Sequence, residues 1–388
     1  MSEKAEASLE LTKSAVEAVQ GVMAFIESAE KLASTCGVFG PLISLAAAIV
    51  KLALGNVDSP ELTYMKEQFQ IVRNKLDVIS DQINDVIREV WKNTMDSQYS
   101  PIEENIKNQF RKYMDILHAK PQYRQAEKEE FLKHFDVSKG DQNLNTLYDA
   151  VMGYSIVFSK PILDTVMKCD QRNRRQMEQF CARLKNLFCI GMIPLLAHAA
   201  ISGNDVKELE KHWNEKLSKV DEKMKSMIDR CINEFAEQAK IDIERFVKEK
   251  EGRDNDQCSS YVLEKLKKKY DWVCWSVRVY NPVGGFDNHC LVACNFICFF
   301  RLNNVNIVVA YSTDPKAVDE GLVRQLMEGR DHVNDAREVA VHVCHGLPAG
   351  HGVHAVRRYK GLCCASSFPA GCDFCQDYSG VTLYVHRA

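Results

Sequence analysis

The chain has 388 residues, of which 46% are hydrophobic and 27% charged, with 50 Lys and Arg against 53 Asp and Glu. This composition is typical of a soluble folded protein of one or two domains, and it excludes an intrinsically disordered chain. The formal net charge of −3 provides no basic excess, so nucleic acid is not an expected partner.

The N-terminal sequence gives an expectation of location. It begins Met-Ser-Glu-Lys and lacks the apolar segment of a secretory signal. We therefore expect a cytoplasmic protein whose fifteen cysteines are mainly reduced thiols, and we leave membrane association open.

A segment without charge lies near the start of the chain. Residues 33–50 contain no Asp, Glu, Lys or Arg, and the part after Pro41 is apolar on every helical face. The stretch from Pro41 to Leu54 is shorter than the ~20 residues of a transmembrane helix. Within residues 38–54 we identify candidates for a membrane-inserting segment: Phe39, Pro41, Leu42, Ile43, Leu45, Ile49 and Val50.

A long amphipathic helix is predicted from about Ser59 to Met95. Apolar residues recur along it in alternating steps of three and four, which is the heptad pattern of a coiled-coil seam. These residues are Met65, Phe69, Val72, Leu76, Ile79, Ile83, Val86 and Val90. The helix would be roughly 55 Å long, so it needs long partner helices to bury the seam.

A second uncharged run covers residues 186–204. It ends a helical region, 143–204, that we expect to be interrupted at Pro161 and Pro194. Like the first run, it combines small and aliphatic residues with expected bends, here at Gly191 and Pro194. The candidates for membrane insertion within residues 187–202 are Phe188, Ile190, Ile193, Pro194, Leu195 and Leu196.

Another very long helix is predicted from about residue 203 to 250. Its apolar face runs from Val206 to Phe246, while Lys and Glu occupy the opposite, solvated face. Shorter helices are expected at 101–117 and 124–135. Together the helices predict an elongated up-down bundle over residues 1–252.

After the polar stretch 251–256, the pattern predicts a β-rich domain over 258–388. Helices are expected at 261–270 and 314–328, and residues 346–379 are expected to form a loop. The predicted strands are Trp272–Tyr280, Cys290–Phe300, Asn306–Tyr311, Arg337–Val343 and Val381–His386. The predicted fold class is therefore α+β, with long helices followed by a small Cys- and His-rich domain that contains strands.

Two interpretations of the uncharged runs stay open. They are either central core helices of a large bundle or stored membrane-active segments that a conformational change releases. His198 lies in the second run, and we interpret it as a structural histidine rather than a pH switch.

The C-terminal cysteines support a weak zinc prediction. Cys372 and Cys375 have the two-residue spacing of half a zinc site. The candidate ligands are Cys363, Cys364, Cys372 and Cys375, with His351 and His354 as further completing residues. The alternatives are buried free thiols, or a disulfide if the chain is exported.

No catalytic constellation is visible in the sequence. Cys344 and His345 are adjacent on a predicted strand, so their side chains would point to opposite faces. The sequence has no Walker, Gly-x-Ser-x-Gly or His-Glu-x-x-His motif. We therefore expect no enzyme activity and, zinc apart, no cofactor.

One motif resembles a known family. The stretch Val279–His289, Val-Tyr-Asn-Pro-Val-Gly-Gly-Phe-Asp-Asn-His, follows the helical body and precedes the Cys-rich end. This combination resembles the rapunzel proteins of fish, which are similar to the cephalotoxin-like proteins. The resemblance implies kinship to helical pore-forming toxins and no known catalytic residues. The export route and extracellular modules of the secreted toxin are not evident in this sequence.

Two functions are expected on these grounds. The first is a toxin-like protein that interacts with membrane lipid or forms pores through the uncharged runs, with a homo-oligomer as one form. The second is a non-enzymatic soluble adaptor or regulatory protein that binds other proteins in development or innate immunity.

Overall fold

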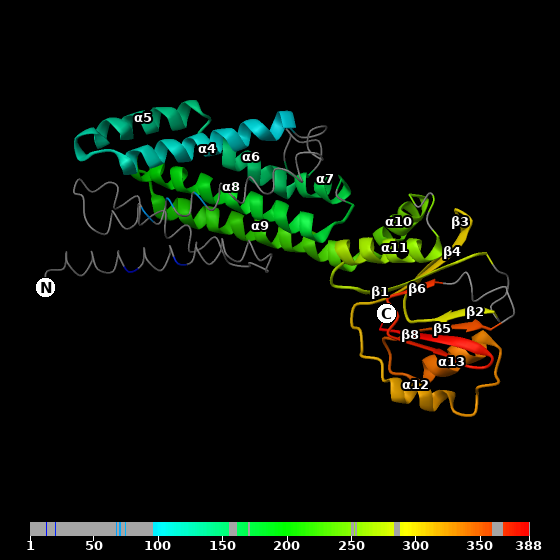
Figure 1. The fold of residues 1–388 in the computed structure, drawn as a ribbon. Helices are drawn as coiled ribbons and strands as arrows, with labels where there is room; N and C mark the ends of the chain where they lie inside the picture. The colour runs from blue at the N-terminus through cyan, green and yellow to red at the C-terminus, as the bar shows by residue number, and fades with distance from the viewer. Residues whose placement is uncertain are drawn as a thin grey trace. The chain divides into compact units, whose positions relative to one another are not determined.

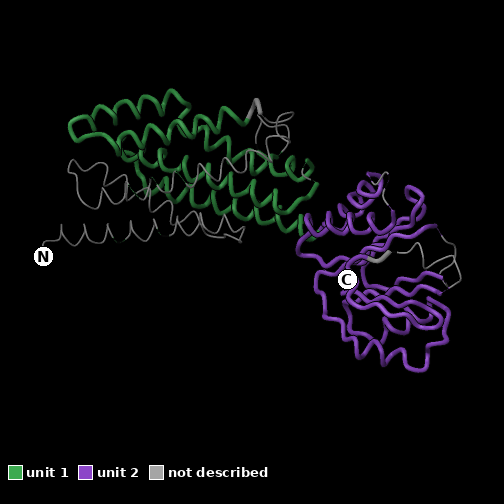
Figure 2. Tube along the Cα trace, in the orientation of Figure 1, with its two compact units in different colours: residues 1–233 green, residues 234–388 purple. Residues whose placement is uncertain are grey.

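The computed structural model describes residues 96–154, 161–169, 171–249, 254–282, 288–358 and 368–387, together with residues 13, 20, 67, 70, 74 and 252. The chain divides into two compact units, Met1–Asn233 and Glu234–Ala388, which have different colours in Figure 2. The first uncharged run lies outside the described residues. So does the predicted helix 59–95, except for three residues in helical conformation: Glu67, Gln70 and Asn74.

The described part of the first unit is helical (Figure 1). Its elements are α4 (Asp96–His118), the 3-10 turn η1 (Pro121–Tyr123), α5 (Arg124–Val137), α6 (Gln142–Met152), α7 (Ile162–Cys169), α8 (Arg174–Ile201) and α9 (Val206–Asn233). Helix α8 contacts α4 and α9 most extensively and also touches α5, α6 and α7. The second uncharged run therefore lies at the centre of the described part of this unit.

Two prolines do not act as the sequence predicted. Pro101 lies inside α4, whose described residues are already helical at Asp96, before the predicted helix start at residue 101. Pro194 lies inside α8, which continues to Ile201. A proline within a helix removes one backbone hydrogen bond, yet α8 continues through the buried Pro194. The predicted interruption at Pro194 is wrong.

The predicted single helix 203–250 is in fact two helices. Helix α9 ends at Asn233, and α10 (Phe235–Lys248) starts after Glu234, whose backbone is not helical. The apolar residues of α9 belong to the core of the first unit, whereas those of α10 belong to a second core. The compact units therefore divide at residues 233 and 234, whereas the sequence placed the domain boundary near 252–258.

The second unit contains two antiparallel sheets in its described residues. Sheet 1 has the strand order β3-β4-β1-β6 and sheet 2 the order β2-β5-β8-β7. The strands are β1 (Cys274–Tyr280), β2 (His289–Val292), β3 (Phe296–Leu302), β4 (Val305–Ser312), β5 (Gly352–Arg357), β6 (Phe368–Ala370), β7 (Phe374–Asp377) and β8 (Val381–His386). The described N-terminal part of the chain is thus helical, and the C-terminal part contains both strands and helices. This arrangement confirms the predicted α+β class.

Helices pack on the two sheets of this unit. Helix α10 and helix α11 (Asn255–Lys269) share an apolar core with β1 and β4 of sheet 1. Helix α12 (Glu320–Met327) and helix α13 (Ala336–Gly346) share another core with sheet 2. Buried Asp242 joins α10 to α11, because it accepts hydrogen bonds from Tyr270 Oη at 2.7 Å and Lys269 Nζ at 2.5 Å.

Several predicted elements of this unit are wrong. Residues 337–343 form part of α13 and not a strand. The predicted strand Cys290–Phe300 is split between β2 and β3, which belong to different sheets. The predicted loop 346–379 contains β5, β6 and β7, and the helix expected at 314–328 starts only at Glu320.

Candidate functional site

The candidate site is the apolar helix α8. Every residue from Leu184 to Ala197 is buried, although a helix with one solvent-facing side would expose a residue on each turn. Among the described helices, α8 alone is long and apolar enough to cross a membrane by length and composition. Its most apolar 18-residue window has a mean hydropathy of 1.6, and 83% of that window is buried. A core helix of a soluble protein meets the same criteria.

The candidates in the second run all belong to this helix. Each has less than a tenth of its surface exposed, and they are Phe188, Ile190, Ile193, Pro194, Leu195 and Leu196. The candidates in the first run, from Phe39 to Val50, lie outside the described residues.

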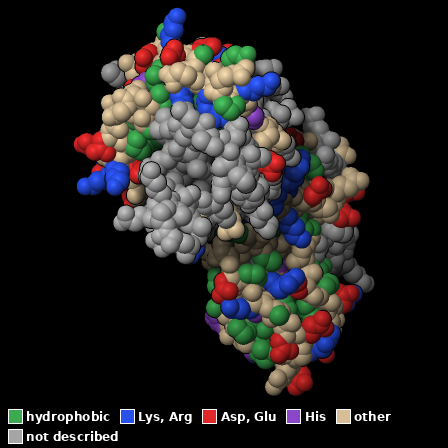
Figure 3. All heavy atoms as spheres, turned by 90° about the vertical axis from the view of Figure 1, so that its left-hand side faces the viewer, with side chains coloured by type: hydrophobic (Ala, Val, Ile, Leu, Met, Phe, Trp, Pro, Cys, Tyr) green, Lys and Arg blue, Asp and Glu red, His purple; other side chains and the backbone are tan. Residues whose placement is uncertain are grey.

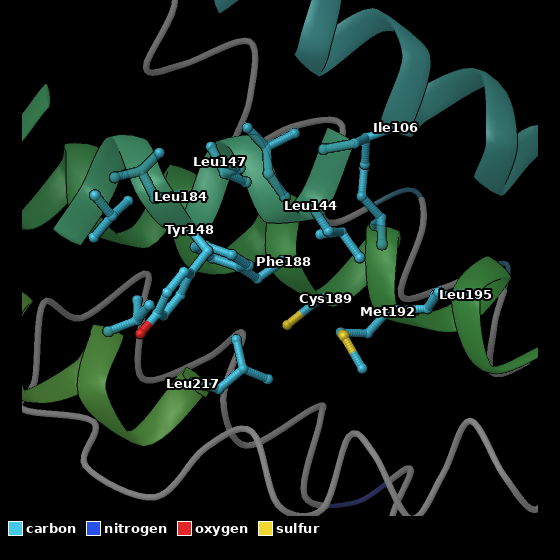
Figure 4. Packing of buried hydrophobic residues seen from close by; sticks show 14 of the residues in the cluster. Ile106, Leu144, Leu147, Tyr148, Leu184, Phe188, Cys189, Met192, Leu195 and Leu217 are labelled. Carbon is cyan, nitrogen blue, oxygen red and sulfur yellow. The ribbon is translucent and has the colours of Figure 1, made fainter. Parts of the chain in front are cut away.

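Figure 4 shows side chains from three of the helices that contact α8. Leu144, Leu147 and Tyr148 come from α6, Ile106 from α4 and Leu217 from α9, and Figure 4 shows them around Leu184, Phe188, Cys189, Met192 and Leu195 of α8.

Gly191 permits this close packing. A Cβ atom at this position would lie 2.6 Å from Cδ2 of Leu144 and 3.2 Å from Cγ2 of Ile106. Both distances are shorter than ordinary carbon contacts, so α4 and α6 can reach α8 only because residue 191 is glycine. From the sequence we expect a bend at Gly191, whereas in the structure this glycine allows the neighbouring helices to pack closely on α8.

Two ion pairs hold α8 at the start of its apolar run. Arg183 Nη2 lies 2.6 Å from Glu103 Oε2 of α4, and Lys185 Nζ lies 2.6 Å from Asp221 Oδ1 of α9. Burial opposes ionisation of Glu103, but the charges of Arg183 and Lys107 outweigh it, so the pKa of Glu103 lies below its usual value. These pairs stabilise the docked position of α8.

A contact with α5 lies near the other end of the run. The ring of His198 stacks on Phe135 with centroids 4.4 Å apart, and its Nε2 lies 3.4 Å from Asp136 Oδ1. Burial lowers the pKa of His198 although Asp136 opposes the shift, so the imidazole is neutral at pH 7. The acidic partners on α4, α5 and α9 were missed in the sequence because only the folded chain brings them to α8.

The predicted zinc ligands are only partly described. Cys363 and Cys364 lie outside the described residues. Cys372 Sγ lies 2.8 Å from the carbonyl oxygen of Phe374, while Cys375 is exposed on β7. The described residues contain no group of three His, Cys, Asp or Glu side chains placed to hold a metal ion, so zinc stays a prediction.

The proposed completing histidines lie in different surroundings. The ring nitrogens of His351 are 2.8 and 3.2 Å from the carbonyl oxygens of Pro348 and Ala317. His354 packs with its ring centroid 4.7 Å from that of His386. Neither contact involves Cys372 or Cys375.

Other cysteines have the properties of structural thiols. Burial raises the pKa of Cys181, Cys189 and Cys372 to about 12, so each is protonated at neutral pH. Cys344 and His345 lie on α13 and not on a strand, with His345 exposed and the pKa of Cys344 raised by burial.

On the described residues visible in Figure 3, Lys and Arg side chains are interspersed with Asp and Glu side chains. Such mixing is typical of a solvated protein surface. Among the described residues of the first unit, the buried apolar side chains form one cluster that includes α8.

Comparison with known proteins assigns the helical region to a family. Residues 56–252 match the family model of the cephalotoxin-like middle helical domain. The chain is also similar to protein rapunzel of Danio rerio, with 40% identity over 212 residues that cover 55% of this chain and 93% of the relative. The chain belongs to the rapunzel and cephalotoxin-like family. No solved structure matches it.

The cephalotoxin-like middle helical domain includes every element of the candidate site. The matched residues 56–252 contain α8, the three helices that cover it and both of its ion pairs. The match ends before β1, so the two sheets lie outside the cephalotoxin-like middle helical domain.

Proposed function

We propose that this protein is a toxin-like, membrane-interacting protein that forms pores by releasing α8 from its helical unit. The observation that carries the proposal is a helix that is apolar around its whole circumference and enclosed by amphipathic helices of a cephalotoxin-like domain. In the docked state the bundle shields α8 from water, and a membrane would shield it equally well.

The dimensions of α8 support insertion. Its 28 residues give a length of roughly 42 Å, of which the uncharged part from residue 186 to 201 contributes roughly 24 Å. A bilayer core is ~30 Å thick. Arg183 and Lys185 would extend the inserted length, since their alkyl chains can lie in lipid while the charges reach the headgroups. One helix per chain cannot enclose a pore, so we also propose that the inserted form is a homo-oligomer.

Release requires the loss of the ion pairs at the start of the run. The Glu103→Gln substitution removes the negative charge that Arg183 faces across α4 and α8, so it weakens the docking of α8. Glu104 is the matched control, because it is the next residue of the same helix and is exposed.

Leakage of a dye from liposomes tests the proposal. We expect the full chain to release dye from anionic vesicles after acidification, and the Glu103→Gln variant to do so faster and at higher pH than either wild type or Glu104→Gln. No leakage from any variant under neutral, acidic or oxidising conditions would refute the membrane function and leave α8 as a core helix.

A second candidate function is supported by the edge of sheet 1. Strand β3 ends this sheet in the described chain, and Phe296 and Phe300 on it have 52% and 60% of their surface exposed. An exposed apolar edge strand is a common surface for binding another protein. In this version the protein is a non-enzymatic cytoplasmic adaptor without a cofactor, and its C-terminal unit binds the partner.

Capture from cell extract distinguishes the two functions. If the protein is an adaptor, the Phe296→Ser and Phe300→Ser double variant should lose specific partners that wild type retains. Partners that persist with the double variant would rule out this edge as the binding surface.

A further inference from the structure

The second unit buries a polar layer between its two sheets. Along β1 the side chains alternate, so that Val277 and Val279 face the core with α10 and α11. Ser276, Arg278 and Tyr280 point the other way, towards sheet 2. The inner layer of a two-sheet structure is ordinarily apolar, so buried Arg278, which is 2% exposed, requires an explanation.

Sheet 2 adds aromatic and imidazole rings to the same layer. Its outer face, with Val353, Leu383 and Val385, packs on α12 and α13. The alternating inner positions on β5 and β8 hold His354, Tyr384 and His386, and β2 contributes His289. We call the set formed by Ser276, Arg278, Tyr280, His289, His354, Tyr384 and His386 the inter-sheet cluster.

Measured contacts show that the members of the cluster meet. Ser276 Oγ lies 2.7 Å from His386 Nδ1, which joins the two sheets directly. The guanidinium carbon of Arg278 lies 5.0 Å from the ring centroid of Tyr384 and 6.0 Å from that of Tyr280. The ring of Tyr280 in turn stacks on His289, with centroids 4.4 Å apart and planes inclined by 9°.

Several imidazole nitrogens in the cluster lack hydrogen-bond partners. Within the described part of the chain, this holds for Nε2 of His354, Nε2 of His386 and both ring nitrogens of His289, all of them buried atoms. His354 and His386 are 2% and 0% exposed as whole residues. Buried polar groups are almost always hydrogen-bonded, so these nitrogens indicate a polar species that completes the layer.

The charge of the cluster decides which species fits. Arg278 carries a permanent positive charge that disfavours a cation, whereas an anion would be attracted to it. The carbonyl oxygen of Gly371 lies 3.2 Å from His386 Nδ1, and because a carbonyl oxygen can only accept, this contact favours the tautomer with the proton on Nδ1. In the neutral ring Nε2 is then an acceptor, so the ligand must also supply a hydrogen-bond donor.

We propose that the inter-sheet cluster is a binding site for a hydrogenphosphate group, either free or at the end of a small phosphorylated ligand. Such a group has oxygens that accept from Arg278 and Ser276 and a P–OH that donates to an imidazole nitrogen. A sulfate or an ionised carboxylate offers the oxygens without the donor. His289 is only partly buried, so the ligand would enter on its side of the cluster.

Histidine NMR of the wild-type full chain tests this site without any substitution. The protein has eleven histidines, and titration with sodium phosphate near neutral pH should shift the imidazole signals of His289, His354 and His386 in a saturable way. The signal of exposed His345 should stay unchanged. Sodium sulfate and sodium acetate at matched ionic strength should cause much smaller shifts.

A substitution tests the location independently. The His354→Gln variant should bind phosphate at least about tenfold more weakly, the loss expected for one hydrogen bond to a charged group, while His345→Gln should bind like wild type. The inference is overturned if wild type shows no saturable shift at the three histidines, if sulfate binds as tightly as phosphate, or if a folded His354→Gln binds unchanged. If that variant does not fold, the wild-type titration decides.

Discussion

The buried imidazoles of the inter-sheet cluster should make the second unit sensitive to acid. Burial and the nearby charge of Arg278 lower the pKa of His289 from 6.5 to about 3. Burial also lowers the pKa of His386 from 6.5 to about 4. The pKa of His354 moves in the same direction, through burial and the neighbouring His386 and Arg278.

The sign of the effect follows from proton binding. Because each histidine has a lower pKa when folded than when unfolded, the unfolded chain binds more protons once the pH falls below about 6.5. Stability is therefore complete above about pH 7 and decreases towards pH 4. At pH 5, His289 and His386 each reduce the free energy of unfolding by about 2 kcal/mol, or about 4 kcal/mol together. This is a large part of the 5–15 kcal/mol typical of a protein domain.

Urea unfolding of the full chain at pH 7.5 and pH 5 measures this loss. Trp275 in the second core and Trp213 in the first both contribute fluorescence, so the second unit is followed as the unfolding transition that changes between the two pH values, and phosphate-free buffer avoids ligand effects. His386→Gln should reduce the difference between the two pH values by about 2 kcal/mol, whereas exposed His345→Gln should leave it unchanged. Equal stability of the second unit at both pH values, or an unchanged difference in His386→Gln, would refute the reasoning.

Three further predictions concern α8, and each is measured as the free energy of unfolding of the first unit in urea. Gly191→Ala should lose about 1–3 kcal/mol, because the added methyl group overlaps Leu144. Helix propensity alone would give a gain in stability, and such a gain would show that α6 can move aside to accommodate the methyl group. Phe188→Ala should lose about 3–5 kcal/mol, since the ring is 0% exposed, and a loss under about 1 kcal/mol would mean that α8 is loosely packed. Arg183→Met should lose about 1–3 kcal/mol by leaving Glu103 without its partner on α8, and its stability should recover when Glu103→Gln is added; no recovery would assign the loss to something other than the ion pair.

Much of the helical unit could be predicted from the sequence because its pattern is local. The uncharged run from residue 186 indicates a helix that is buried on all sides, and the structure describes such a helix from Leu184 to Ala197. The break at Glu234 could not be predicted, because apolar residues continue at helical spacing from Cys231 to Phe235. That spacing is the same whether the two faces belong to one core or, as here, to two.

The misassigned helix α13 shows how a strand pattern can be misleading. Val339, Val341 and Val343 alternate with other residues, which favours a strand. Asp335 was the overlooked signal, because its side chain accepts hydrogen bonds from the backbone N–H groups of Arg337 and Glu338 at a helix start. The buried residues of α13 are Ala336, Val339, Ala340 and Val343, and these steps of three, one and three are helical spacing.

The inter-sheet cluster could not be found from spacing at all. Ser276 and His386 are in direct contact although 110 positions separate them, and His289 and His354 come from two further strands. In β1, the alternation of polar and apolar residues predicts one face that points to water, whereas a second sheet covers that face. The family resemblance seen at Val279–His289 is similarly separate from the match at residues 56–252 that shows the family.

The central position of α8 also affects how the protein is made. Its covering helices lie on both sides of it in the chain, with α4 and α6 before it and α9 after it. As the polypeptide leaves the ribosome, the apolar part of α8 emerges while α9 is still unsynthesised or inside the exit tunnel. During that interval the nascent chain presents a segment that would adhere to chaperones, to other nascent chains or to a nearby bilayer.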